Sequence, residues 1–429
     1  MHEWPTGGDE AWPPGDGLPP FTDEEIQFII DYGQYDRATL RRFWTNVHNE
    51  DVNGDLVTEL GEYRAIVRAR SIDTDGDGND AVYNIYPFEI GMGGSGGNND
   101  LYHIIAFSSW RNGTDADIYA YQFINDNPGQ VVQLTHDGGV MSEELEPAIA
   151  TVGSDQWLVF ATNRENPLAG GIKSDFDIVK LRLNYSTEGH LIAPNSYNFQ
   201  DLGDPNQCDR LVQSEYDERE PDINPDATNF AWTRNYNGQN DIYVWNGGTP
   251  IRLTANYADD EAPHFDRTDP DNVIWFHSYR AGGGNCEIYY LSPTGPEGLS
   301  NMPTKVTNHS GFDGYPASRG VGGQAITWTS DRLSSDPGRF DIFFTDFVVA
   351  PFSISRYEDD PVDYIDRFSS FSYDGTWIAF TSDRKNENLD IWRAQWEITG
   401  DTGHSIPTSL TRVTNASDPD ENPYYGGGG

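Results

Sequence analysis

WIAFTSDRKNENLDIWRAQW (Trp377–Trp396) is one copy of a phrase that recurs along the chain. It joins an apolar run, a Ser or Thr, an Arg, a variable polar loop and a second run in which an acid precedes aliphatic and aromatic residues. Earlier copies of the phrase are Ile104–Tyr121, Trp157–Leu181, Asn229–Trp245, Val273–Leu291 and Ala325–Thr345. A repeat of roughly 45–70 residues that holds several short strand-like runs is typical of a β-propeller.

The full repeat is longer than this phrase. A short run that usually ends in an aliphatic residue and Thr belongs to each repeat, and these runs begin at Gln133, Arg210, Arg252, Lys305, Ser353 and Arg412. An acidic loop, a Pro or an equivalent residue, a short inner run and an Asp-Gly-like turn then lead into the next copy. One unit therefore predicts four antiparallel strands, and their aliphatic and aromatic content suits sheets buried on both faces.

The two ends of the repeat region predict how the ring closes. The first copy, near residues 101–135, has no inner strand of its own, whereas the chain ends with an outer strand and one further strand-like run at Asn422–Tyr425. We expect this last run to pair beside Ile104–Ser108, so that no sheet edge stays open. The predicted fold class is all-β, a six-bladed propeller of four-stranded antiparallel blades, preceded by a small helical calcium-loop segment.

The sequence motifs IAFTSDR and LDIW, preceded by LT, an acidic residue and Pro, resemble the TolB-like propeller repeats. These repeats are relatives of the WD-repeat and dipeptidyl-peptidase-type propellers. The resemblance covers roughly residues 101–429 and implies the propeller fold. The first 100 residues do not resemble the α/β domain that precedes the propeller in TolB, so the resemblance does not extend TolB's own role to this chain.

The amino-acid composition limits the classes of ligand and partner that the chain is expected to bind. The chain has 429 residues with 69 acidic and 27 basic side chains, a net charge of −42. Nucleic acid is excluded as a ligand class, because phosphate binding needs clustered Lys and Arg. An acidic surface with only four lysines suits a secreted protein, or a salty or cation-rich environment. We therefore expect an extracellular or periplasmic location.

Other segments of the chain carry weaker signals. No run of 18 apolar residues exists, so no membrane span is expected. The polar opening MHEWPTGGDE does not read as a signal peptide, which suggests a mature or trimmed chain. Cys208 and Cys286 are expected at opposite ends of different sheets, so a disulfide between them is not expected. The sequons at Asn112, Asn184, Asn308 and Asn415 matter only if the source glycosylates its proteins.

Residues 1–100 divide into two parts. Residues 1–20 are rich in Pro, Gly and Trp, which predicts an extended arm without a core. Residues 21–100 predict a small helical segment with Asp-rich loops and a Gly-rich linker, because Thr22 and Glu25 fit a capping box and a second run has apolar residues at helical spacing. The propeller is assigned to residues 101–429.

Two loops in the helical segment predict calcium sites, since Ca²⁺ prefers six to eight oxygen ligands. The clearer one places oxygen ligands at Asp73, Asp75, Asp77 and Asn79, with Asn84 where a bidentate Glu belongs. The other resembles an EF-hand or dockerin loop but has Leu56 at the turn position, and its ligands would be Asp51, Asn53, Asp55, Glu59 and Glu62. A solvated acidic turn is the alternative for both.

Aligning the repeats reveals one acid per copy, three residues before the Pro position: Glu144, Glu218, Asp260, Asp313, Asp366 and Asp420. We expect these acids to ring the mouth of the central channel, where they would bind a cation or a basic group. Structural pairing with the repeat arginines is favoured over such a site, because a repeated position usually serves the repeat; these arginines are Arg111, Arg164, Arg280, Arg332 and Arg384. The third copy has Tyr236 at the Arg position and Arg234 displaced, so that pairing is expected to be missing there.

Enzymatic candidates are few. Gly93–Gly97 matches the G-x-S-x-G pattern, but it lies in a Gly-rich linker rather than between a strand and a helix. Four histidines are expected on the channel-mouth face, where some propeller lyases hold a metal, but they share no repeated spacing: His136, His264, His277 and His309. Packing or surface roles explain them as well, so no catalytic residue is assigned.

The sequence favours a secreted or periplasmic, calcium-stabilised propeller that serves as a protein-binding or assembly scaffold. A metal-dependent polysaccharide lyase or glycosidase is one alternative. A structural subunit of an extracellular assembly or filament, joined through the N-terminal arm to a neighbouring subunit, is another. A mouth lined with Trp and Tyr would favour carbohydrate, and a bare acidic mouth would favour a protein or a cation.

Overall fold

A computed structural model describes residues 102–427, which belong to a unit spanning Asp100–Gly429. The segments outside the description are 1–101, 112–114, 125–126, 136–140, 153–154, 165–171, 186–190, 192–207, 248, 272, 321–324, 335–337, 349, 356–363, 373–374, 385–387, 396–407 and 428–429. The predicted arm, the helical segment and both calcium loops therefore lie outside the described residues and stay predictions.

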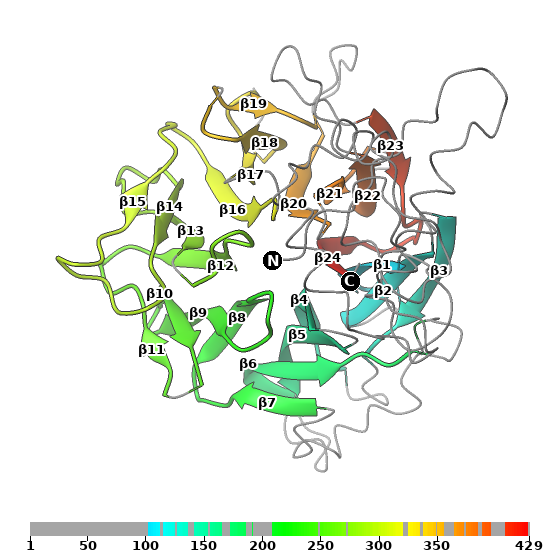
Figure 1. The fold of residues 1–429 in the computed structure, drawn as a ribbon, viewed down its shortest axis with the longest axis horizontal. Helices are drawn as coiled ribbons and strands as arrows, with labels where there is room; N and C mark the ends of the chain where they lie inside the picture. The colour runs from blue at the N-terminus through cyan, green and yellow to red at the C-terminus, as the bar shows by residue number, and fades with distance from the viewer. Residues whose placement is uncertain are drawn as a thin grey trace, which may run out of the picture. The chain divides into compact units, whose positions relative to one another are not determined.

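The described residues form six four-stranded antiparallel sheets around a central axis (Figure 1). From the axis outward, blade 1 contains β24 (Asp420–Gly427), β1 (Tyr102–Ser109), β2 (Asp117–Ile124) and β3 (Asn127–Gln133). Blade 2 contains β4 (Glu144–Val152), β5 (Asp155–Arg164), β6 (Ile172–Arg182) and β7 (Cys208–Val212). Blade 3 contains β8 (Asp217–Ile223), β9 (Phe230–Tyr236), β10 (Gln239–Trp245) and β11 (Ile251–Arg252).

The remaining three blades follow the same inner-to-outer order. Blade 4 contains β12 (Asp260–Phe265), β13 (Ile274–Ser278), β14 (Glu287–Leu291) and β15 (Thr304–Lys305). Blade 5 contains β16 (Asp313–Ser318), β17 (Ile326–Ser330), β18 (Asp341–Thr345) and β19 (Phe352–Ser353). Blade 6 contains β20 (Asp366–Phe371), β21 (Trp377–Ser382), β22 (Asp390–Gln395) and β23 (Thr408–Arg412). The predicted all-β, six-bladed propeller of four-stranded antiparallel blades is confirmed.

The chain's last strand completes the first blade, as the sequence predicts. β24 pairs antiparallel with β1, and Tyr425 lies opposite Ile105. Tyr425 is buried in a cluster that also holds Phe107 of β1 and Ile391 of blade 6. Burying an aromatic ring and two apolar neighbours between the first and last blades makes closure part of the core.

Apolar side chains fill the spaces between neighbouring blades. Trp232, Trp275 and Trp328 occupy the second strands of blades 3, 4 and 5, and all three are fully buried. Phe265 and Phe276 of blade 4 pack against the apolar face of blade 3 in the same way. The free thiol of Cys286, beside β14, is also buried. Stacked sheets thus bury both faces, which explains the continuous apolar runs in the repeat.

In five blades a Thr, or Ser355 in blade 5, ends the outer-strand motif and joins the third and fourth strands of its blade. The Thr135 hydroxyl accepts a hydrogen bond from the Ile118 amide at 2.8 Å and donates to Asp117 at 3.2 Å. Thr307 repeats this arrangement with Ile288 and Glu287 in blade 4. The acid that starts the DIY motif and the Thr of the LT motif are therefore structural partners.

Each inner strand contains a residue in the left-handed region, two positions after the predicted mouth acid. The φ angles there lie between 51° and 59°, at Glu146, Glu220, Ala262, Tyr315, Phe368 and Asn422. In blades 2 to 6 the register with the second strand shifts at this residue, which marks a β-bulge. The strain of a non-Gly residue at positive φ costs about 1–3 kcal/mol, so the surrounding contacts have to offset it.

The bulge amide is one such contact, because it donates to a side chain of the preceding blade. The Glu146 amide donates to Ser108 Oγ at 3.0 Å, and the Phe368 amide donates to Thr329 Oγ1 at 3.2 Å. Blade 2 has Ala161 at the Ser or Thr position, and the Glu220 amide donates to Glu146 Oε2 instead, at 2.6 Å. Successive blades are thus joined by backbone donors along the channel.

Candidate functional site

The six predicted mouth acids all lie at the start of inner strands, and all are buried. Five pair with an arginine of their own blade: Asp420 with Arg111, Glu218 with Arg234, Asp260 with Arg280, Asp313 with Arg332 and Asp366 with Arg384. The sixth, Glu144, accepts hydrogen bonds from the Ser142 and Thr162 hydroxyls. This geometry matches the structural role that the repeat favours, since buried carboxylates are stable when paired.

One detail of that prediction is wrong. Arg234 pairs with Glu218 at 2.8 Å, so the third blade does not lack its ion pair. Arg234 lies directly across the sheet from Glu218, at the position where Ser278 faces Asp260 in the next blade. The arginine therefore reaches the acid from the neighbouring strand rather than from the strand end.

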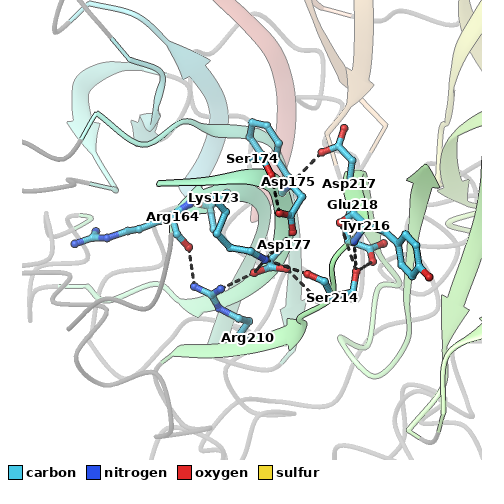
Figure 2. Close-up of polar contacts among 12 residues, drawn as sticks. Arg164, Lys173, Ser174, Asp175, Asp177, Arg210, Ser214, Tyr216, Asp217 and Glu218 are labelled. Carbon is cyan, nitrogen blue, oxygen red and sulfur yellow. Dashed lines mark hydrogen bonds and ion pairs between the residues drawn. The ribbon is translucent and has the colours of Figure 1, made fainter. Parts of the chain in front are cut away.

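Figure 2 shows a second buried acid of blade 2 with its partners. Asp177 of β6 pairs with Lys173 at 2.8 Å and with Arg210 of β7 at 2.5 Å. The Ser214 amide also donates to Asp177, and Asp217 of β8 accepts from the Phe176 amide at 3.1 Å. These contacts satisfy the charges within the blade and join blade 2 to blade 3, which indicates a structural cluster.

The central channel departs from the repeat. A cavity of about 160 Å³ is lined by all six bulge residues and by the residues that follow them. Its wall is acidic at Glu146 and Glu220 of blades 2 and 3, and aromatic at Tyr315 and Phe368 of blades 5 and 6. A position that the repeat holds in one backbone conformation thus carries five different residue types in the six blades.

Side chains cross the far end of this channel. The Tyr424 hydroxyl of β24 donates to Asp222 of blade 3 at 2.8 Å. Arg267, just after β12, donates to the Phe371 carbonyl of blade 6 at 2.6 Å and to the Tyr425 carbonyl of blade 1 at 3.3 Å. His264 also lines the cavity near Asp222, and burial lowers the pKa of its ring. These contacts join blade 4 to blades 1 and 6 across the axis.

A second cavity, of about 210 Å³, lies between the inner strands of blades 2, 3 and 4. Its lining is entirely polar: Glu146, Asp217, Arg219, Glu220, Thr233, Asn235, Asn240 and Glu261. It shares Glu146 and Glu220 with the channel cavity. We call it the acidic pocket.

Two of the four carboxylates of the acidic pocket, those of Glu146 and Glu261, pair with a basic side chain. Arg219 pairs with Glu146 at 2.7 Å. His277 of β13, which is buried, lies 3.0 Å from Glu261, and this hydrogen bond and the charge of His277 hold the pKa of Glu261 below its usual value despite burial.

Glu220 and Asp217 form no ion pair within the described part of the chain. Glu220 accepts hydrogen bonds from neutral donors there, namely the Thr233 hydroxyl and the Ala262 amide, both at 2.8 Å. Burial, and then the neighbouring carboxylates of Glu146 and Glu261, raise the pKa of Glu220 to about 7, although His277 opposes the shift. Glu220 is therefore a carboxylate that holds a proton near neutral pH.

The predicted histidines do not gather at one place in the described structure. His264 lines the channel cavity, His277 pairs with Glu261, and the His309 ring accepts the Gly311 amide on an outer loop. His136 lies outside the described residues. Across residues 102–427, with the gaps given above, no group of three His, Cys, Asp or Glu side chains is arranged to hold a metal ion. In the same residues no helix has the length and apolar character to cross a membrane.

Sequence reasoning missed the three residues that make this site unusual: Glu146, Glu220 and Glu261. A signal was present for Glu146 and Glu220, because the position before the Pro, or before Ser369 in blade 6, reads Glu, Glu, Ala, Tyr, Phe and Asn around the ring. Glu261 lies one residue earlier in its repeat and had no such signal. An alignment that seeks constant positions ignores such a variable one, although the channel lining is set there.

No protein-family model matches the chain, and no curated protein matches its sequence. The fold is similar to that of TolB from Acinetobacter baumannii, with a TM-score of 0.52, 14% identity, and coverage of 75% of this chain and 66% of that one. A putative TolB from Agrobacterium tumefaciens gives a TM-score of 0.41 at 16% identity, covering 73% of this chain and 89% of that one. The similarity to the Acinetobacter protein supports the fold, and the chain spans just under two thirds of that protein.

Proposed function

We propose that this chain is a binding scaffold that docks a protein partner at the mouth face, the end of the propeller where the inner strands begin. The observation that carries the proposal is the broken repeat in the channel lining, where acids on one side face aromatic rings on the other. If this position served only the propeller frame, we would expect similar residues there in every blade. Asymmetric side chains on a symmetric frame are typical of a site for a ligand.

The chemistry of the mouth face favours a protein over a carbohydrate. The acidic pocket is lined by carboxylates, amides and a hydroxyl, with no Trp or Tyr in its wall. Exposed apolar side chains lie near it on the same end of blades 2 and 3, at Met141, Tyr236 and Tyr257. Met and Tyr are enriched in protein interfaces, where they supply contact area at low cost in conformational entropy.

The proposal keeps two further parts of the sequence-based interpretation. The acidic composition supports an extracellular or periplasmic location. The Asp-rich loops at residues 51–62 and 73–79 support calcium as a stabilising ion, because alternating carboxylates in a short loop repel one another without a cation. Both remain parts of the proposal.

A photo-crosslinking amino acid placed at Tyr257 tests the docking face in cells that naturally produce the protein. Tyr257 is fully exposed on the mouth face, and Val348, 87% exposed on the loop at the opposite end of blade 5, is the matched control. We expect a discrete protein adduct from position 257 and none from position 348. An adduct of equal yield at position 348, or none at position 257, would overturn the proposal.

A further inference from the structure

The β9–β10 hairpin of blade 3 joins the acidic pocket to an exposed aromatic surface. Asn235 and Asn240, on its two strands, line the pocket. Tyr236 follows Asn235 and is 43% exposed. The Asn240 amide donates to Asp259 at 2.9 Å, which fixes the loop that carries the fully exposed Tyr257. Tyr236, whose ring packs against that of Tyr216 at 5.0 Å between centroids, is thus next in sequence to a lining residue, and Tyr257 lies on the adjoining loop.

The charges inside the pocket do not balance. Four carboxylates line it, from Glu146, Asp217, Glu220 and Glu261, against the single guanidinium of Arg219. Arg219 pairs with Glu146, and His277, behind the wall, pairs with Glu261. The Glu220 carboxylate is left with neutral donors among the described residues. Glu220 is half-buried and close to other carboxylates, so a proton or a cation stabilises it there.

The surroundings of Glu220 suit a cationic side chain better than a bare metal ion. Within the described residues no metal-binding group of three side chains forms at the pocket. Amide oxygens and hydroxyls beside the carboxylates, at Thr233, Asn235 and Asn240, offer acceptors to the several N–H donors of a guanidinium or an ammonium. The exposed tyrosines can contact the aliphatic stem of such a Lys or Arg side chain, or its cationic group over the face of a ring.

We infer that the acidic pocket receives one Arg or Lys side chain of an extended segment of the partner, with Glu220 as its counter-ion and Tyr236 and Tyr257 as the flanking contact surface. This inference rests on the proposed docking function and names the chemistry of the segment that docks. Charge complementarity supports it twice, because the pocket has surplus carboxylates and the whole chain has a net charge of −42.

The same geometry predicts that binding depends on pH. The groups that face Glu220 are Glu146 from β4, Asp217 and Arg219 from β8, Glu261 from β12, His277 from β13 and Tyr315 from β16. Because the pKa of Glu220 is about 7, the free site is mostly protonated at pH 6 and mostly ionised at pH 8. A cation competes with that proton, so its affinity should rise about tenfold over this interval.

Random 12-residue peptides displayed on phage and selected on the full chain provide the probe. We expect the enriched peptides to share an Arg or Lys at one position. In a synthetic peptide of the selected sequence, replacing that Arg by neutral citrulline (or that Lys by acetyl-lysine) should weaken binding at least tenfold in fluorescence anisotropy. Enrichment of peptides with no shared basic position, failure to enrich any peptide, or equal affinity of the neutral peptide would overturn the inference.

Variants of the protein locate the contact. Glu220→Gln keeps an oxygen that accepts from Thr233 and Ala262, so the fold should be retained, as circular dichroism and thermal melting will show. It should weaken peptide binding about tenfold and abolish the rise between pH 6 and pH 8. Asp271→Asn makes the same charge change on an exposed loop at the opposite end and should change affinity less than twofold.

If Glu220→Gln and Asp271→Asn behave alike, the pocket is not the contact. A crosslink at position 257 combined with tight binding of the neutral peptide would retain the docking face and reject the cationic side chain. Loss of the crosslink together with strong binding of basic peptides would instead reject the proposed partner site, so the two failures are distinguishable.

Discussion

Replacing Arg384 tests whether the ion pair of each blade stabilises the frame. Arg384 is 6% exposed and Asp366, its partner across blade 6, is 2% exposed. The Arg384 guanidinium also donates to the Ser355 carbonyl and lies over the rings of Tyr364 and Phe380, at 5.0 and 5.6 Å from their centroids. Methionine keeps an unbranched stem against these rings, so Arg384→Met removes the charge and the hydrogen bonds with little change in packing.

The expected loss follows from the burial of the partner. Removing one member of a buried pair leaves an uncompensated charge, which costs about 3–5 kcal/mol of unfolding free energy. We expect the lower end, about 3 kcal/mol, because Asp366 can take up a proton: burial raises its pKa to about 6 even beside Arg384. The matched control is Arg182→Met, because the Arg182–Asp155 pair is 40% and 35% exposed. Exposed pairs contribute less than about 1 kcal/mol.

The pH dependence sharpens this test. A carboxyl whose folded pKa is raised to about 6 stabilises the fold when protonated, and that contribution is lost as pH rises through 6. Without Arg384 the folded pKa of Asp366 rises further, so the loss extends above pH 6. The deficit of the variant should therefore be largest near pH 7.5 and shrink toward pH 5.

Urea unfolding of the full chain, followed by tryptophan fluorescence at pH 5 and pH 7.5, measures both effects. Comparing midpoints between variants avoids reliance on a two-state model for a protein of this size. A deficit for Arg384→Met that equals that of Arg182→Met at pH 7.5, or one that grows toward pH 5, would refute the reasoning.

Three further predictions concern the ends of the chain. Deleting residues 410–429 removes β24 and the buried Tyr425, so cooperative thermal unfolding should be lost; a truncated protein that melts like the intact one would contradict closure. Calcium bound at residues 73–79, and less certainly at 51–62, should raise the melting temperature in calorimetry relative to a chelator-treated sample; an unchanged melt with no metal in mass spectrometry would end that claim. Deleting the arm, residues 1–20, should weaken association in sedimentation velocity while leaving the melt of the propeller unchanged, and unaltered association would count against an assembly role for it.

The sequence predicted the frame well because the frame is repeated. Six copies of one phrase average out local ambiguity, and the missing inner strand of the first copy pointed to Asn422–Tyr425 as its replacement, as the pairing of β24 with β1 confirms. The acids that recur before each Pro were likewise visible, and their pairing with arginines follows from burial. Regular elements are therefore the part of this protein that a sequence alone specifies.

The site was harder to predict because it depends on exceptions to the repeat. Arg234 was expected to leave Glu218 unpaired, and only the strand register shows that the two lie opposite each other. Ala161 has no side-chain oxygen to accept the hydrogen bond of the Glu220 amide, and the Glu146 carboxylate accepts it instead. This compensation involves residues in different strands. The convergence of Glu220 and Glu261 depends on the distance between two inner strands, which no periodicity in the sequence encodes.

The left-handed residues of the inner strands separate the stability of the ring from the identity of its lining. Their amides, rather than their side chains, make the bonds to the preceding blade, as at Ala262, Tyr315 and Phe368. A substitution at these three positions can change the charge, size or polarity of the channel in one blade and leave the amide hydrogen bond to the preceding blade in place. Glu146 and Glu220 differ, because their carboxylates accept an amide from the following blade. Ala262, Tyr315 and Phe368 are therefore the positions at which new specificity can be engineered into the channel one blade at a time.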